Sequence, residues 1–367
     1  MSVFLLILSV VMFIGLVVIH EFGHFVAARR GGVEVEEFGI GFPPRVWSKK
    51  VKTKNSKFLF TVNALPLGGF VRLKGESDAA TQKGSFGAAP LGTKVKIMLA
   101  GVVMNFVAAL ALFTLLALMG MPKLVDNQFT VASDTKVTRE VTVLAAEVDS
   151  NQPAGRAGIQ NGDQLISIDG TKLTNPTQIG SIARDNAGKT IPFVVRHDGQ
   201  QREVQVTINA ENTGNGFVGV VPGREGIQLQ KSTWSAPVVA VGLTKQLTGL
   251  TFKGIGTAFS SLFKGDTKTA KEQVAGPVGI AVILNEGSKI GINFVLFIIA
   301  ILSLSLAIIN VLPIPALDGG RLFVLLLFKA LKKPLTKSRE EAIHGAGFVA
   351  LMGLFVLITI VDVQRFF

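Results

Sequence analysis

The 367-residue sequence has no cysteine, and histidine occurs only four times. The absence of cysteine excludes disulfide bonds and thiolate metal ligands, so any metal ion must be held by imidazole or carboxylate groups. Acidic residues are scarce as well, since 25 Asp and Glu stand against 37 Lys and Arg. The formal net charge of +12 is compatible with a nucleic-acid or a membrane partner, and the placement of the charges decides between them.

The positive charges lie mainly in two segments next to apolar runs. Residues 29–96 contain thirteen Lys and Arg but only five Asp and Glu, and residues 329–339 have the same bias. Basic loops between apolar spans are typical of the cytoplasmic side of a membrane. The charge pattern therefore favours the lipid bilayer as a partner, and we expect no nucleic-acid binding.

Apolar residues make up 48% of the chain and gather in four long runs, at residues 3–19, 97–121, 290–312 and 346–361. A bilayer core of about 30 Å needs roughly 20 apolar residues per helix, and each run approaches this length with its flanks. The sequence therefore predicts four transmembrane helices. With both basic loops in the cytoplasm, the water-soluble insert between the second and third runs lies outside the cytoplasm.

The segment before the third run differs from the four apolar runs. In residues 232–263 apolar residues recur at helical spacing, but Lys245 and Lys253 interrupt them. This pattern favours amphipathic helices on the membrane surface, and a fifth span is the alternative.

The stretch GLVVIHEFGHFVAA, residues 15–28, places ionisable side chains within the first apolar helix. His20 and His24 are four residues apart, so both imidazoles lie on one helix face and can bind the same ion. With Glu21 they form the H-E-x-x-H arrangement of zinc hydrolases, in which the glutamate accepts a proton from metal-bound water. Ionisable residues within a span usually mark a functional site. We therefore expect a Zn²⁺ site here; a polar cluster at the end of the span is the alternative.

A catalytic zinc needs a third protein ligand. Asp318 in the stretch LSLAIINVLPIPALDGGRLF follows the third apolar run, and the predicted topology puts it near the cytoplasmic face. The H-E-x-x-H end of the first helix reaches the same face. Asp318 is therefore the candidate third ligand, although Pro and Gly around it also suit a simple turn between helices.

The insert contains SNQPAGRAGIQNGDQLISIDGTKL, residues 150–173. A helix start at Pro153, a turn at Gly162-Asp163 and a strand ending at Asp169-Gly170 follow the order found in PDZ domains, which this insert resembles. The resemblance implies peptide binding at a sheet edge. A Gly-Leu-Gly-Phe loop is missing from the insert, so binding of a terminal carboxylate does not follow, and an unrelated β-rich domain is the alternative.

The two motifs with this insert between them resemble the site-2 protease family of intramembrane zinc proteases. The family pattern of Asn-x-x-Pro followed by Leu-Asp-Gly is matched by Asn310, Pro313, Leu317, Asp318 and Gly319. The resemblance implies that Asp318 is the third zinc ligand. It also implies that Asn310 holds the substrate strand or the developing oxyanion; an interhelical hydrogen bond is the other role open to this amide.

Residues 57–75 alternate like strands around Gly68-Gly69. By resemblance, a membrane-associated β-hairpin lies beside the active site, and its edge, with Gly68, Gly69 and Phe70, positions an unwound substrate segment. An ordinary cytoplasmic hairpin is the alternative.

The expected fold is an α-helical membrane protein with about four transmembrane helices, a membrane-associated β-hairpin and an inserted extracytoplasmic PDZ-like α/β domain. The expected parts are residues 1–121 (first half of the membrane core), 122–225 (PDZ-like domain), 226–285 (amphipathic surface helices and linker) and 286–367 (second half of the core).

The resemblance implies a protease of the inner (cytoplasmic) membrane that cleaves transmembrane segments of single-pass proteins, such as anti-sigma factors or remnant signal peptides. A zinc or proton transporter and a membrane-anchored PDZ scaffold are the rival functions. A transporter is expected to show repeated halves, which this sequence lacks. A scaffold gives no reason for His20, Glu21 and Asp318.

Overall fold

The computed structural model describes residues 2–53, 56–173, 175–197, 199–212, 216–264 and 276–367. The chain folds into two compact units. The membrane unit consists of Val3–Met119, Phe129–Val131 and Thr233–Phe367. The sheet unit consists mainly of Gly120–Gln128 and Ala132–Ser232, which in the sequence are inserted between the two halves of the membrane unit.

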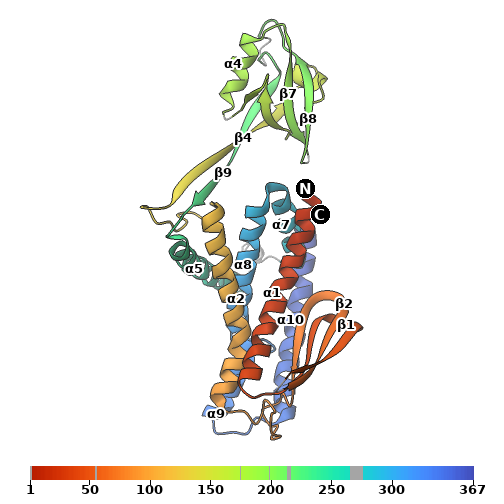
Figure 1. Ribbon diagram of the computed structural model, residues 1–367, viewed down its shortest axis with the longest axis vertical. Coiled ribbons are helices and arrows are strands. Elements are labelled where there is room, and N and C mark those ends of the chain that lie inside the picture. The colour runs from red at the N-terminus through yellow and green to blue at the C-terminus, as the bar shows by residue number, and fades with distance from the viewer. Residues whose placement is uncertain (1, 54–55, 174, 198, 213–215, 265–275) are drawn as a thin grey trace. The chain divides into compact units, whose positions relative to one another are not determined.

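Four helices in the described part of the chain are long and apolar enough to cross a membrane, as the sequence predicts. They are α1 (Ser2–Arg30), α2 (Leu91–Met119), α8 (Ile292–Val311) and α10 (Lys337–Phe366). At 1.5 Å per residue, the shortest, with 20 residues, already spans about 30 Å. Helices α1, α2 and α8 lie side by side in the membrane unit (Figure 1).

A glycine and a pair of aromatic rings illustrate how closely these helices pack. A Cβ atom at Gly23 of α1 would lie 2.5 Å from the Ala100 carbonyl oxygen of α2, so only glycine permits this close crossing. Between α2 and α8, the Phe113 and Phe297 rings meet edge to face at 5.8 Å. Lipid tails are as apolar as these side chains, so close packing rather than the hydrophobic effect holds the helices together.

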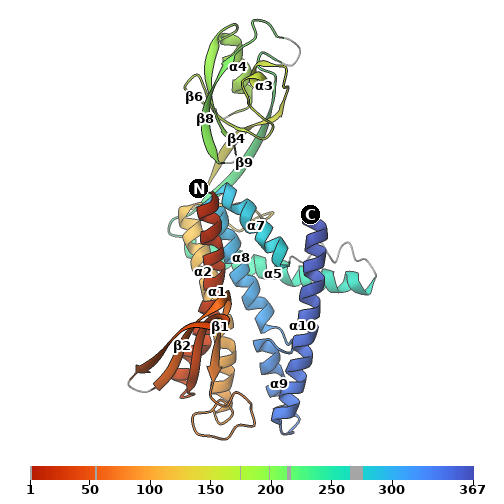
Figure 2. The same cartoon turned by 90° about the vertical axis from the view of Figure 1, so that its right-hand side faces the viewer.

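Three further helices complete the membrane unit: α5 (Ala236–Phe263), α7 (Pro277–Ile290) and α9 (Asp318–Ala330). Helix α5 is not among the four candidate spans, and it runs across the other helices (Figure 2). Residues 265–275, part of the predicted linker, lie outside the described residues.

Asp362, only 1% exposed near the end of α10, accepts a 2.7 Å hydrogen bond from the Gly279 N–H at the start of α7. A Cβ atom at Gly276 or Gly279 would contact this carboxylate, at 2.7 and 3.2 Å. The two glycines therefore make room for a side chain that bonds α10 to α7.

The β-hairpin is larger than the sequence predicts. Strands β1 (Val35–Thr53) and β2 (Ser56–Leu73) pair antiparallel from Val35 opposite Leu73 to Thr53 opposite Ser56, with irregular positions between. Residues 37–40 pair with 69–72 on one side and with 59–62 on the other. Gly68 and Gly69 lie inside β2 and do not connect two separate strands. Their lack of side chains instead allows β2 to bend where its pairing is irregular.

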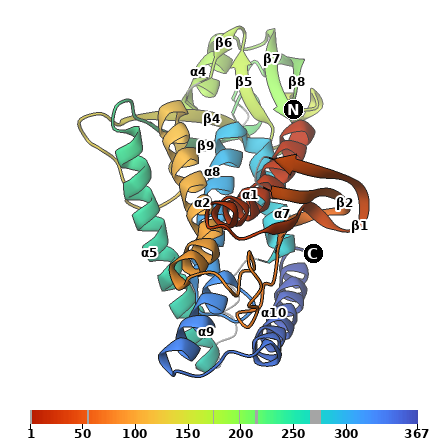
Figure 3. The same ribbon diagram turned by 60° about the horizontal axis from the view of Figure 1, so that its bottom comes forward.

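Aromatic side chains attach this hairpin to α1, beside which it lies in Figure 3. The Phe25 ring of α1 meets the rings of Phe38 and Phe58 edge to face, at 5.4 and 4.9 Å. On the sheet, buried Glu37 bonds Arg45 at 3.1 Å and Arg72 at 3.0 Å, which satisfies its charge. The hairpin is thereby held next to the helix that carries His20 and His24.

The sheet unit is a seven-stranded sheet with two short helices. Its strands are β3 (Met121–Pro122), β4 (Lys136–Val148), β5 (Gln164–Ile168), β6 (Thr171–Lys172), β7 (Thr190–His197), β8 (Gln200–Thr207) and β9 (Val220–Lys231). The order is β3-β9-β4-β5-β7-β8, with β6 beside β5. Helices α3 (Pro153–Arg156) and α4 (Thr177–Asp185) complete it. Alternating Ile191, Phe193 and Val195 on β7 point into its core.

Candidate metal centre

Helix α1 carries two buried histidines on one face. His20 and His24 are one turn apart, and their Nε2 atoms lie 3.1 Å from each other. Both residues are less than 10% exposed. Two imidazole nitrogens thus meet inside a membrane-spanning helix bundle, where polar groups require a partner.

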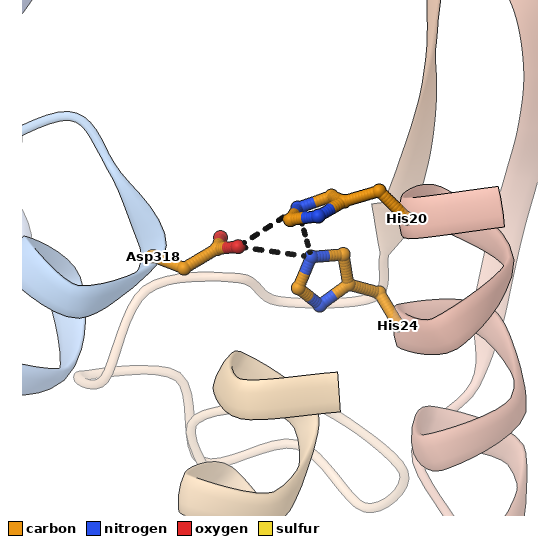
Figure 4. Close-up of side chains that lie close together, drawn as sticks. All are labelled: His20, His24 and Asp318. Carbon is orange, nitrogen blue, oxygen red and sulfur yellow. Dashed lines mark hydrogen bonds and ion pairs between the residues drawn. The ribbon is translucent and has the colours of Figure 1, made fainter. Parts of the chain in front are cut away.

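Asp318, the first residue of α9, completes the cluster (Figure 4). Its Oδ2 atom lies 2.9 Å from His20 Nε2 and 3.2 Å from His24 Nε2. Burial raises the pKa of the Asp318 carboxyl, but its contacts with His20 and His24 outweigh this effect, so that the pKa lies well below its usual range. The structure therefore brings together the three predicted metal-ligand residues from the two ends of the chain.

Two glycines explain how α9 can begin at this point. A Cβ atom at Gly319 would lie 2.2 Å from the Val311 carbonyl oxygen, and one at Gly320 would lie 1.9 Å from that of Ile314. The chain from the end of α8 therefore folds back tightly against the first turn of α9 because both positions lack side chains. This fold directs Asp318 toward α1.

The donor atoms fit a small metal ion. Ligands at 2.0–2.1 Å around a tetrahedral zinc are separated by about 3.3 Å, close to the 2.9–3.2 Å seen here. The His24 Nδ1–H donates to the Ile97 carbonyl oxygen at 2.7 Å, which leaves the Nε2 lone pair directed at the cluster. Among the described residues, His20, His24 and Asp318 form the cluster of side chains that could hold a metal ion.

Helix α2 forms the wall behind this cluster, a feature that the sequence does not predict. A Cβ atom at Gly101 would lie 2.5 Å from the Nε2 atoms of both His20 and His24. Asn105, one turn further along α2, has its Nδ2 atom 3.3 Å from His20 Nδ1. Asn105 could have been noticed as a lone amide in an apolar run, whereas a glycine in a span gives no chemical signal.

Glu21 lies beside the cluster and not within it. A Cβ atom at Gly69 would lie 3.5 Å from Glu21 Cγ, and one at Gly68 would lie 3.4 Å from Val17 Cγ1 of α1. The predicted base and the two glycines of the strand are therefore close neighbours.

The other two predicted positioning residues lie less directly at the cluster. The Phe70 ring covers Gly39 on the sheet, where a Cβ atom would lie 2.4 Å from the ring. Asn310 lies in the last turns of α8 and donates a 3.0 Å hydrogen bond to the Leu306 carbonyl oxygen of its own helix. Neither residue belongs to the donor group described above.

A cavity of about 800 Å³ opens next to Asp318. It is lined by residues of the loop after β2, of the start of α9 and of the first turns of α10. Buried Glu340 of α10 accepts hydrogen bonds from the Ser77 hydroxyl and the Asp78 N–H, at 3.0 and 2.9 Å. These bonds fix one wall of the cavity, and Asp318 lines the same cavity.

Comparison with known proteins places this geometry in a family. A relative from Clostridium perfringens is 31% identical over 98% of both chains. The "Zinc metalloprotease RasP" of Geobacillus kaustophilus is 27% identical over 98% of this chain and 97% of its own. The "Regulator of sigma-E protease RseP" of Salmonella typhimurium is 26% identical over 95% of this chain and 96% of its own. The family model described as "Peptidase family M50" matches residues 8–354, so the chain belongs to peptidase family M50.

Proposed function

We propose that this protein is a zinc-dependent protease of the site-2 type, which hydrolyses peptide bonds within transmembrane segments of single-pass membrane proteins. The observation that carries the proposal is the cluster of His20, His24 and Asp318, with Glu21 beside it, in a bundle of membrane helices. Relatives named as zinc metalloproteases and membership of a peptidase family support zinc and peptide hydrolysis.

In this proposal His20, His24 and Asp318 hold the ion and Glu21 is the general base. When bound, zinc supplies Lewis acidity toward water and toward the scissile carbonyl. Glu21 accepts the proton of the attacking water and returns it to the leaving amine nitrogen. Its place outside the ligand group, next to the cluster, suits a residue that moves protons and does not bind the metal.

Strand β2 is the proposed site of the substrate backbone. A transmembrane helix hides its carbonyl groups in its own hydrogen bonds, so it must unwind before water can attack. Residues 69–72 pair with 37–40 along one side, and near Glu21 the strand lacks side chains at Gly68 and Gly69. An extended substrate segment at this edge, with Phe70 next to it, replaces the lost backbone bonds.

Asn310 is proposed to position the substrate strand or the developing oxyanion, although its amide now bonds its own helix. Either role requires the amide to leave the Leu306 carbonyl when substrate binds.

The sheet unit is proposed to be an extracytoplasmic PDZ-like domain that excludes bulky, untrimmed substrates and binds peptide. The order of its elements supports this proposal, as does the basic character of the loops on the other side of the spans. The proposed substrates are single-pass membrane proteins such as anti-sigma factors or remnant signal peptides. The name of one relative, a regulator of sigma-E protease, supports the anti-sigma factors. Deleting residues 125–225 should allow cleavage of an untrimmed substrate; unchanged selectivity argues against a filter.

The direct test is cleavage of a reporter transmembrane peptide by the purified full-length protein in detergent. Wild-type protein should cleave it, a zinc chelator should stop cleavage, and added zinc should restore it. Glu21→Gln should bind zinc but cleave at least 10²-fold more slowly, because it lacks the base. Cleavage that persists in Glu21→Gln or in chelator contradicts the proposal, and zinc uptake into vesicles without cleavage supports the transporter instead.

A further inference from the structure

Asn105 is a buried amide that the proposed reaction does not use. It lies on α2, is 1% exposed, and has its Nδ2 atom 3.3 Å from His20 Nδ1. Its Oδ1 atom is buried and has no hydrogen-bond partner among the residues that the structure describes. A buried carbonyl oxygen left without a donor is costly in any protein and more so among membrane helices. This arrangement therefore calls for a donor that Oδ1 meets in another state of the site.

The chemistry of a metal-bound imidazole supplies that donor. A neutral imidazole carries one N–H, so a histidine that gives its Nε2 lone pair to a metal carries the proton on Nδ1. His20 Nε2 faces Asp318 and His24, which is the side of the proposed metal. Its Nδ1 faces Asn105. A half-turn of the Asn105 amide exchanges Nδ2 for Oδ1, an acceptor for this N–H.

We propose that Asn105 is a positioning residue of the metal centre, which holds His20 in the Nδ1–H tautomer through its Oδ1 atom when zinc is bound. Without metal, His20 Nε2–H donates to Asp318 Oδ2, and Asn105 presents its Nδ2 to the bare Nδ1. When zinc binds, the neutral imidazole would change tautomer: the Nε2 proton is released to water and a proton from water is taken up at Nδ1. The Asn105 amide would then rotate so that Oδ1 accepts the new Nδ1–H. The inference rests on the proposed zinc site and adds to it the residue that prepares the first ligand.

The second histidine already has an acceptor for its Nδ1–H, and no side chain has to rotate to provide it. His24 Nδ1–H donates to the Ile97 carbonyl oxygen of α2 at 2.7 Å. Ile97, Gly101 and Asn105 follow one another at intervals of four residues and therefore lie on one face of α2. On this face Ile97 provides the acceptor for His24, and Asn105 provides the proposed acceptor for His20. Gly101 lies between them and leaves space beside both Nε2 atoms.

The position of Asn105 is itself fixed. Its backbone carbonyl oxygen accepts a 2.8 Å hydrogen bond from the buried hydroxyl of Ser303 on α8. The α2 segment is thus tied to the neighbouring span, and the Asn105 side chain can turn its amide while its backbone stays in place. A residue that only packed helices together would need no particular acceptor at this point.

The test compares the zinc affinity of full-length Asn105→Leu, Asn105→Asp and wild-type protein by competition with a chelator. Asn105→Leu keeps the shape but has no acceptor, so its affinity should fall 10- to 100-fold. Asn105→Asp keeps an acceptor and should bind zinc within about threefold of wild type or more tightly. Thr114→Val is the matched control, because the Thr114 hydroxyl donates to the Leu110 carbonyl oxygen within α2 itself, and the zinc affinity of this variant should equal that of wild type.

A second measurement needs no variant. Nitrogen-15 NMR of histidine-labelled wild-type protein should show His20 protonated at Nδ1 when zinc is bound. Wild-type affinity in Asn105→Leu, equal losses in the Leu and Asp variants, or His20 protonated at Nε2 in the zinc form each overturn the inference. A wild-type protein that binds no zinc, or binds it no better than His20→Ala does, is a separate result, which contradicts the proposed function itself.

Discussion

Gly101→Ala tests whether α2 shapes the metal centre. The added Cβ atom would lie 2.5 Å from the Nε2 atoms of both His20 and His24, and ordinary contact begins at 3.4 Å. Each separation must therefore grow by about 0.9 Å, whereas metal–ligand distances tolerate only about 0.2 Å. The imidazoles cannot easily retreat, because His24 is held at Nδ1 by the Ile97 carbonyl. The substitution should therefore spread the ligands apart.

The size of the effect follows from this displacement. Overpacking of a well-packed interior costs about 1–3 kcal/mol, so the protein should still fold. A misplacement near 1 Å at reacting groups lowers activity by about 10²-fold, and we expect at least that loss here. Zinc affinity should fall by a similar factor, equivalent to about 2.7 kcal/mol.

The assay measures zinc affinity by chelator competition and cleavage of the reporter peptide, with Gly15→Ala as the matched control. Gly15 lies in α1, and outside its own helix backbone no described residue has an atom within 4 Å of its added Cβ. The same change there should leave both measurements intact and improve helix propensity by about 1 kcal/mol or less. Zinc affinity and activity of Gly101→Ala equal to those of Gly15→Ala would refute the reasoning.

Two further substitutions probe the surroundings of the site. Gly69→Val places a Cβ atom 2.9 Å from the Gly39 carbonyl oxygen, so β2 must shift away from β1 at this edge beside Glu21. Cleavage should fall about tenfold or more while zinc content stays constant, and unchanged cleavage argues against a substrate strand here. Glu340→Gln replaces the charged carboxylate that accepts a hydrogen bond from the Ser77 hydroxyl. The free energy of unfolding should fall by about 1–3 kcal/mol, measured by thermal unfolding, and an unchanged melting temperature contradicts this.

The sequence allows prediction of those features that depend on composition and on reactive side chains. Four apolar runs predict the four candidate spans. The four-residue spacing of His20 and His24, together with the predicted topology that puts Asp318 at the same face, predicts the cluster. These signals are local, or they follow from the side of the membrane on which each residue lies.

The rest depends on spatial neighbours that a single sequence does not display. The wall formed by α2 uses a backbone carbonyl at Ile97 and an absent side chain at Gly101, neither of which has a chemical signature. Strand β1 is rich in charged residues and reads as a basic loop, because its pairing depends on residues of β2, from Ser56 opposite Thr53 to Leu73 opposite Val35. For the same reason Gly68-Gly69 resembles a turn although it lies inside β2.

Metal analysis of the purified full-length protein tests most directly that three residues hold one zinc ion. Wild-type protein and Glu21→Gln should each carry about one zinc per chain, because both keep the complete ligand set. Asp318→Ala should lose the ion during dialysis against a chelator while it remains folded. Stoichiometric zinc in folded Asp318→Ala, or none in wild-type protein, would contradict the account.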